Sequence, residues 1–284
     1  MIKSITLSLL SSLLLLASAC SKDDIGNFVN DSDLSQEEII QGLKEALIVG
    51  TDTSTSLLSA SGGYFNDQAV KILLPENIRQ SISTFQTKSF TVLGVNLTGQ
   101  QLYDGYSNSL LGINIPGLSS KEDQLVVGIN TAAEQAAATA TPIFREAITG
   151  ISISDATNIL FGGDNTAATS YLEQETSSSL FANYEPKIDQ ALTSVKIGNS
   201  SVVDSYEDFV NSYNDMLNTT VGIFGTIGSL TNMQTVSQTD LSAYATQKGL
   251  DGLFLKIGEE EKDIRENPIA RVNSILQNVF GELD

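Results

Sequence analysis

The acidic side chains are the groups in this sequence that could transfer protons. The chain of 284 residues contains no His and one Cys, so acid or base catalysis would have to use carboxylates, Lys or Tyr. Glycoside hydrolysis needs two carboxyl groups across a bond, and Glu134 with Glu260 could supply such a pair. Nothing in the sequence places those two groups together. A His-free, carboxylate-dependent hydrolase of the cell envelope is therefore the alternative hypothesis for the function.

Glu134 also has a structural interpretation, which we favour. It lies in the middle of an Ala-rich apolar stripe, and a buried carboxylate is costly unless it is paired. Arg265 or Arg271 would be a natural partner in a salt bridge between helices. We therefore expect no catalytic residue. The candidates for a structural ion pair or a ligand groove are Glu134, Glu259, Glu260, Arg265 and Arg271.

The run Glu259-Glu260-Glu261, which precedes Arg265, is typical of a solvated helix face. Glu261 and Arg265 are one turn apart, and an exposed pair at this spacing contributes only about 0.2–0.5 kcal/mol. Consecutive Glu residues on a helix point in different directions and cannot converge on one ion. The chain also has no Walker sequence and no dinucleotide fingerprint after a strand. We predict no metal site and no cofactor.

The composition excludes several further classes of protein. Without His there is no Ser-His-Asp triad and no His-ligated zinc or haem, and one Cys excludes internal disulfides and iron–sulfur clusters. The 15 Lys and Arg against 34 Asp and Glu give a formal net charge of −19, which repels a polyanion. Nucleic acid is therefore not an expected partner.

The amino-terminal residues have the pattern of an export signal. A basic Lys3 precedes an apolar run that is too short to span a membrane, and the small residues Ala17-Ser18-Ala19 lead directly to Cys20. This run resembles a bacterial lipobox, which implies removal of residues 1–19 and lipidation of Cys20. An ordinary secretory signal with an incidental Cys is the alternative. Because such lipoproteins carry more than one acyl chain, membrane lipid is an expected partner.

Residues 20–34 are expected to be a lipidated flexible tether. Within them, Ser21-Lys22-Asp23-Asp24 looks like a surface-export signal of bacterial lipoproteins, and it could equally be part of a polar tether. The predicted location is the bacterial outer membrane, with the protein facing the periplasm or the cell surface.

The remaining residues, 35–284, have the spacing of helices. A capping box at Ser35-Gln36-Glu37-Glu38 opens a predicted helix over 36–58. A second box at Ser119-Ser120-Lys121-Glu122 opens one over 119–147, which Pro142 should kink or interrupt. Helical spacing resumes after Pro186, and Asp240 caps a last long helix that ends at Asn267-Pro268.

Two segments do not have a helical period. Residues 87–118 contain five Gly among scattered apolar residues and predict an irregular insertion, with room for a short hairpin. The Gly-rich and Thr-rich piece around Gly222, Gly225 and Gly228 predicts a loop that covers the bundle. The predicted fold class is all-α: a single-domain bundle of several helices with an irregular insertion around residues 87–118.

The chain from Ser35 to Phe280 resembles the bacterial family called domain of unknown function 4197 (DUF4197). The resemblance rests on short motifs spread along the chain, of which the carboxyl-terminal ones are the most specific. They include Gly42-Leu43-Lys44-Glu45-Ala46-Leu47, Pro142-Ile143-Phe144, Lys248-Gly249-Leu250-Asp251-Gly252-Leu253-Phe254, Asn267-Pro268 and Ala270-Arg271. The resemblance implies a mostly helical, exported or lipid-anchored protein and brings no established activity. The chain departs from the family pattern at Thr131, where a basic residue is common, and in its longer segment 87–118.

These observations favour a membrane-anchored lipoprotein that is not an enzyme. We expect a binding or structural role in the cell envelope, with a protein or small molecule as the partner. A binding protein predicts a groove or an exposed apolar patch, whereas a hydrolase predicts two converging carboxyl groups in a cleft.

Overall fold

A computed structural model describes residues Leu34–Asp284, which form one compact unit. The predicted signal sequence 1–19, Cys20 and the predicted tether up to residue 33 lie outside the described residues. The main helices are α1 (Gln36–Ser59), α4 (Ser119–Ala137), α5 (Ala140–Gly150), α7 (Ala167–Ser194), α8 (Val202–Asn218) and α10 (Leu241–Glu266). None of the helices in this part of the chain is both long and apolar enough to cross a membrane. The prediction of a mostly helical fold is confirmed.

Shorter elements complete the unit. The short helices are α2 (Glu76–Gln86), α3 (Gly99–Asp104), α6 (Ala156–Phe161), α9 (Ile227–Thr231), the 3-10 helix η1 (Pro268–Ala270) and α11 (Ser274–Gly281). The strands are β1 (Ser89–Val92), β2 (Val95–Thr98), β3 (Tyr106–Asn108), β4 (Ile113–Ile115), β5 (Lys196–Ile197) and β6 (Ser200–Ser201). They pair as three antiparallel two-stranded ribbons.

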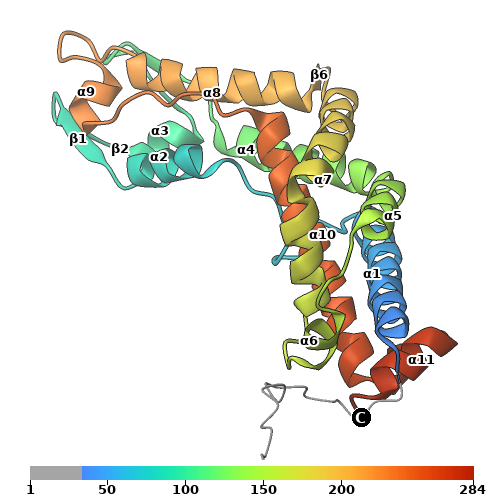
Figure 1. Cartoon of the computed structure of the whole chain (residues 1–284). Coiled ribbons are helices and arrows are strands. Elements are labelled where there is room, and N and C mark those ends of the chain that lie inside the picture. Colours follow the sequence, from blue (N-terminus) through green and yellow to red (C-terminus); the bar gives the residue numbers. More distant parts are fainter. Residues whose placement is uncertain (1–33) are drawn as a thin grey trace, which may run out of the picture. The chain divides into compact units, whose positions relative to one another are not determined.

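Helices α1, α7 and α10 form the centre of the helical body, with α4, α5, α6 and α11 packed around them (Figure 1). Close approach is possible because glycines stand where two helices meet. A Cβ atom on Gly50 of α1 would lie 3.3 Å from the Ile257 side chain of α10, and one on Gly258 would lie 3.3 Å from Thr166 before α7. Leu43 and Leu47 of α1 are fully buried at this centre.

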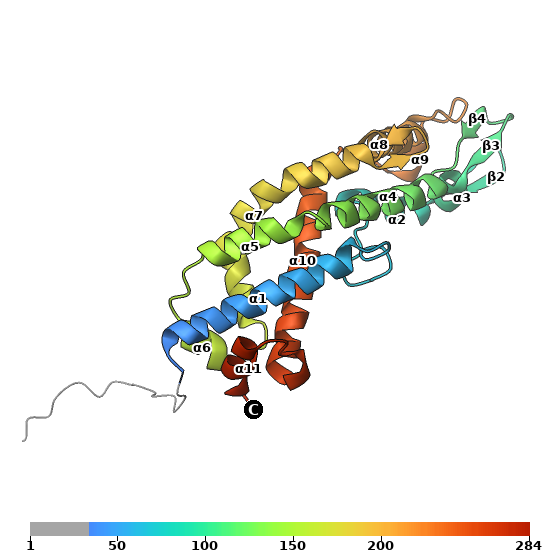
Figure 2. The same ribbon diagram turned by 90° about the vertical axis from the view of Figure 1, so that its right-hand side faces the viewer.

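Helix α4 continues from this body to a second group of elements, α2, α3, α8, α9 and the first two ribbons, at the other end of the unit (Figure 2). The expected irregular insertion is therefore more regular than the sequence indicated. It contains the β1–β2 hairpin, helix α3 and the β3–β4 hairpin, with Phe90 opposite Leu97 and Tyr106 opposite Ile115. Leu97 is buried, so the insertion contributes to the core.

The segment after α8 also differs from its prediction. The Gly-rich residues expected to form a loop over the bundle instead contain α9 and pack against α8 at the hairpin end. The Asn214 side chain of α8 holds the returning chain, since it donates to the Val236 carbonyl at 3.0 Å and accepts from the Val236 amide at 2.8 Å.

The helix is interrupted next to Pro142, as predicted, whereas Pro186 does not interrupt its helix. The break lies at residues 138–139, before Pro142, so Pro142 occupies the first turn of α5, where its missing N–H needs no partner. Pro186 lies inside α7, which continues through it. Tyr184 and Ile188, on either side of Pro186, are both fully buried, and their packing outweighs the one lost backbone hydrogen bond.

The predicted caps are confirmed in part. Ser35 and Glu38 form the expected capping box of α1, with the Ser35 amide donating to Glu38 Oε2 at 2.9 Å. Asp240 caps α10 by accepting from the Ala243 amide at 3.0 Å. The predicted capping box at Ser119-Ser120-Lys121-Glu122 is wrong, because α4 already begins at Ser119 and its N-cap residue is Leu118.

Candidate functional site

The most extensive polar cluster in the described interior surrounds Glu261, a residue that the sequence placed on a solvated face. Its carboxylate is fully buried and accepts from the Ala168 and Thr169 amides at 3.0 and 2.7 Å and from Thr169 Oγ1 at 2.6 Å. These amides are in the first turn of α7, where backbone N–H groups lack helical partners. Glu261 therefore completes the amino end of α7 from within α10.

Arg265 completes the same cluster from one turn further along α10. It donates to Glu261 Oε1 from Nε at 2.9 Å and from Nη2 at 2.8 Å. Its remaining donors reach the Leu160 and Ile159 carbonyls of α6 at 2.9 and 3.0 Å. The pair thus binds a helix start and a helix end together, and all of its strong hydrogen bonds are internal. We call Glu261 and Arg265 the helix-end clamp.

Arg271 holds the carboxyl terminus in a related way. The guanidinium is buried and donates to the Ile264 and Arg265 carbonyls at the end of α10, at 3.0 and 3.1 Å. It also makes two hydrogen bonds of 2.8 Å to the two carboxylate oxygens of Asp284. This bond lowers the pKa of Asp284 below its usual value.

Glu134 pairs with neither arginine, in contrast to the expected salt bridge. Its Oε1 accepts from the amides of Tyr64 and Phe65 in the loop after α1, both at 3.3 Å. One turn earlier, the buried Asn130 accepts from the Ile72 amide at 2.8 Å and donates to the Ile72 carbonyl at 2.7 Å. Both α4 side chains therefore hold the connection between α1 and α2.

Neither Glu259 nor Glu260 is bonded to Glu134, whose carboxylate is buried. Glu259 is exposed and accepts from Lys256 at 2.8 Å, and the same Lys256 nitrogen lies 2.8 Å from Asp67. Glu260 is partly buried, and this burial raises its pKa, with a further contribution from the Asp263 charge. The structure thus does not join Glu134 and Glu260 across a cleft.

A groove of about 420 Å³ lies between the start of α7 and the middle of α10. Phe254, Leu255 and Gly258 form its apolar part, and Glu259 lies at its edge. The Asp251 carboxylate, also at the edge, accepts from Lys248 at 2.8 Å. Of the candidates named from the sequence, Glu259 is the one that lines this groove.

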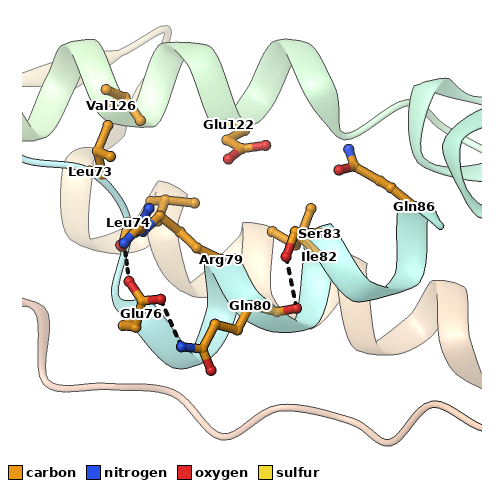
Figure 3. Close-up of a pocket in the computed structure, with 10 residues that line it drawn as sticks. All are labelled: Leu73, Leu74, Glu76, Arg79, Gln80, Ile82, Ser83, Gln86, Glu122 and Val126. Atoms are coloured by element: carbon orange, nitrogen blue, oxygen red, sulfur yellow. Dashed lines mark hydrogen bonds and ion pairs between the residues drawn. The ribbon is translucent and has the colours of Figure 1, made fainter.

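A second hollow, of about 330 Å³, lies between α2 and α4 (Figure 3). Glu122 and Val126 project into it from α4, and Arg79 of α2 forms an ion pair with Glu76 at its opposite side. Glu122 is fixed by the Tyr103 hydroxyl, which donates to it at 2.5 Å. Burial, together with this hydrogen bond, raises the pKa of Tyr103. No part of this hollow was foreseen from the sequence.

The described residues offer little for metal chemistry. Within residues 34–284, no group of three or more His, Cys, Asp or Glu side chains could hold a metal ion. Glu134 instead accepts from a backbone amide, Glu261 from Arg265 and Glu259 from Lys256. What the arrangement can do is hold helix ends in place and present shallow hollows, one of which, of about 420 Å³, is lined by Arg265.

The sequence contains one signal for the burial of the helix-end clamp. Glu261 follows Ile257 by four residues and precedes Ile264 by three, so it continues the apolar stripe of α10. Asn130 gave no comparable signal, because it bonds to the backbone of the distant residue Ile72. Asp284 gave none either, since its bond to the Arg271 side chain depends on how the chain turns after α10.

Comparison with known proteins adds a family and no activity. No curated protein and no solved structure matches the chain. The family described as "protein of unknown function (DUF4197)" matches residues 33–94 and 108–281. The unmatched residues 95–107 fall inside the segment that the sequence marked as a departure, and they hold β2, α3 and the start of β3. The match spans most of the chain, so the protein belongs to the DUF4197 family.

Proposed function

We propose that the mature protein is a lipid-anchored binding or structural protein of the bacterial cell envelope. Acyl chains on Cys20 hold it in the outer membrane, and residues 21–34 act as the tether. The helical unit then presents its surface to a protein or small-molecule partner on the periplasmic or the external side. The anchor is proposed from the sequence around Cys20 alone.

One observation favours a binding or structural role over hydrolysis. The buried charged groups of the described unit are bonded to backbone groups at helix ends and loops. Glu261 binds two amides of α7, Arg265 binds two carbonyls of α6, and Glu134 binds two amides after α1. A general acid needs a carboxyl group that faces a substrate, whereas these groups face the protein.

Intact-mass analysis of the membrane fraction tests the anchor. The wild-type chain should lack residues 1–19 and carry the additional mass of the acyl chains. The Cys20→Ala variant should carry no such mass, and Ser32→Ala, a change within the tether, should be acylated like the wild type. An unacylated soluble wild-type product would overturn the proposal.

Protease treatment of whole cells then distinguishes the two sides of the membrane. Digestion of the acylated wild type in intact cells would place the helical unit outside, and its partner would be an external one. Protection in intact cells, with digestion after the outer membrane is opened, would place the unit and its partner in the periplasm.

A further inference from the structure

Three long segments at the hairpin end of the unit contain no charged residue. Residues 89–103, 105–120 and 216–239 contain no Asp, Glu, Lys or Arg, in a chain whose formal net charge is −19. These segments form the two hairpins, α3 except for its last residue, Asp104, and the region around α9, which lie at one end of the unit in both views (Figures 1 and 2). The acidic side chains in the rest of the chain repel anionic surfaces. Transfer of these uncharged segments out of water therefore costs less electrostatic free energy than transfer of any charged part.

Large apolar side chains protrude from the turns at this end. Leu93 in the β1–β2 turn is 62% exposed, Leu110 in the β3–β4 turn is 74% exposed, and Ile223 in the turn before α9 is 95% exposed. Phe224, beside Ile223, is 44% exposed. We call these four residues the hairpin tip surface. The hairpins bury other residues, such as Leu97 and Ile113, so the exposed ones are not needed to attach the hairpins to the core.

The backbone at Leu93 supports a role for this side chain other than folding. Leu93 and Gly94 both have positive φ angles, 51° and 78°, as in the two-residue turn that favours Asn-Gly. A Leu in this region of φ is strained, whereas Asn or Gly adopts it readily. Strain that a simple substitution would relieve points to a function for the side chain that is present.

We propose that the hairpin tip surface inserts into the interfacial region of a phospholipid bilayer. The side chains protrude from three separate turns, and none of the hollows described above includes them. Exposed apolar groups that protrude from separate turns fit a deformable lipid surface, whereas a protein partner would need a matching pocket for each turn. Binding of this kind increases with the apolar area buried and needs no basic residues.

Two other exposed apolar residues differ from the hairpin tip surface in having charged neighbours. Ile269 and Val272, near η1, are 89% and 68% exposed, but the charged residues Glu266 and Arg271 are their close neighbours in the sequence. Helix α11, which follows them in the chain, lies at the opposite end of the unit from the hairpins (Figures 1 and 2). Substitution of this pair is therefore a matched control for loss of exposed apolar area.

The test uses the mature-length chain, residues 20–284 with Cys20→Ala, so that no acyl group contributes. Flotation with vesicles of phosphatidylethanolamine and phosphatidylglycerol measures its partition. The chain should float with the vesicles, and Leu93→Asn/Leu110→Asn/Ile223→Asn should lower the partition coefficient at least about tenfold. Ile269→Asn/Val272→Asn should change it by less than about twofold, and binding should persist at high salt.

Several results would overturn the proposal. They are absence of flotation, equal loss in the control variant, and release by salt. A concentration-dependent oligomer that forms without vesicle binding and is lost in the triple variant would assign the surface to a second copy of the chain instead. Circular dichroism melting should show that all variants fold. Since the chain carries no acyl group here, failure of this test leaves the proposed Cys20 anchor unaffected.

Discussion

Glu261 and Arg265 form a buried ion pair on one helix, and between them they bind the ends of two others. The two contacts of 2.9 and 2.8 Å join side chains that are both almost completely buried. Removal of two charges from water is costly, and the cost is offset only when further hydrogen bonds satisfy both groups. The α7 amides and the α6 carbonyls supply those bonds, so the pair stabilises an arrangement of three helices.

Loss of one partner of the helix-end clamp should be strongly destabilising. In Arg265→Leu, the Glu261 carboxylate would remain buried without its cation, and we expect the free energy of unfolding to fall by about 3–5 kcal/mol. Urea denaturation followed by circular dichroism measures this loss.

The exposed pair Lys248–Asp251 is a control on the same helix, with side chains 46% and 42% exposed. Its loss in Lys248→Ala should cost no more than about 1 kcal/mol, because water and salt screen the pair. Equal losses in the two variants would show that burial adds nothing to the helix-end clamp.

The bond between Arg271 and Asp284 should make stability depend on pH in the acidic range. The Arg271 guanidinium lowers the pKa of Asp284 in the folded protein, so the folded state favours the ionised carboxylate. The contribution should be complete above the unfolded value of about 3.9 and should be lost as the pH falls through the lower folded value.

Thermal unfolding of the wild type and Asp284→Asn checks this dependence. The wild type should be more stable at neutral pH, and the difference should disappear in strong acid. Glu282→Gln, a change at an exposed residue two positions earlier, should show no such convergence. A difference between wild type and Asp284→Asn that stays constant with pH would contradict the assignment.

The sequence predicted the parts of this fold that depend on local periodicity. The start of α1 at the Ser35 capping box and the cap of α10 at Asp240 are examples, since each depends on residues within one turn. The continuous α7 was not predicted, because its passage through Pro186 depends on packing against other helices. The hairpins of 87–118 were missed in detail because each strand has only three or four residues.

The buried polar contacts also depend on packing between distant segments, which local sequence does not predict. Arg265 was expected to pair with a buried carboxylate, but the carboxylate was expected to be Glu134 and not Glu261. Both glutamates lie on apolar helix faces, so local sequence could not choose between them. The choice depends on which helix end lies opposite, and here the start of α7 lies opposite Glu261.

Two buried tyrosines should respond in opposite ways to loss of the hydroxyl group. The Tyr64 hydroxyl donates to the Gly249 carbonyl at 2.7 Å, so Tyr64→Phe should cost about 0.5–1.5 kcal/mol of unfolding free energy. The buried Tyr184 hydroxyl has no hydrogen-bond partner among the described residues, so Tyr184→Phe should be neutral or stabilising. Urea denaturation of both variants measures the two effects, and a clear loss in Tyr184→Phe would contradict the assignment.

Helix α11 packs so closely against Gly42 of α1 that a substitution which favours helix formation should nevertheless destabilise the protein. A Cβ atom on Gly42 would lie 2.6 Å from three carbons of Val279, so Gly42→Ala should cost about 1–3 kcal/mol even though Ala is the better helix former. Gly150→Ala in α5 meets no atom within 4 Å and should stabilise by up to about 1 kcal/mol. The cost of Gly42→Ala should shrink in a Val279→Ala background, because two of the three clashing carbons, Cγ1 and Cγ2, are then removed. An unchanged cost in urea denaturation would show that α11 does not rest on Gly42.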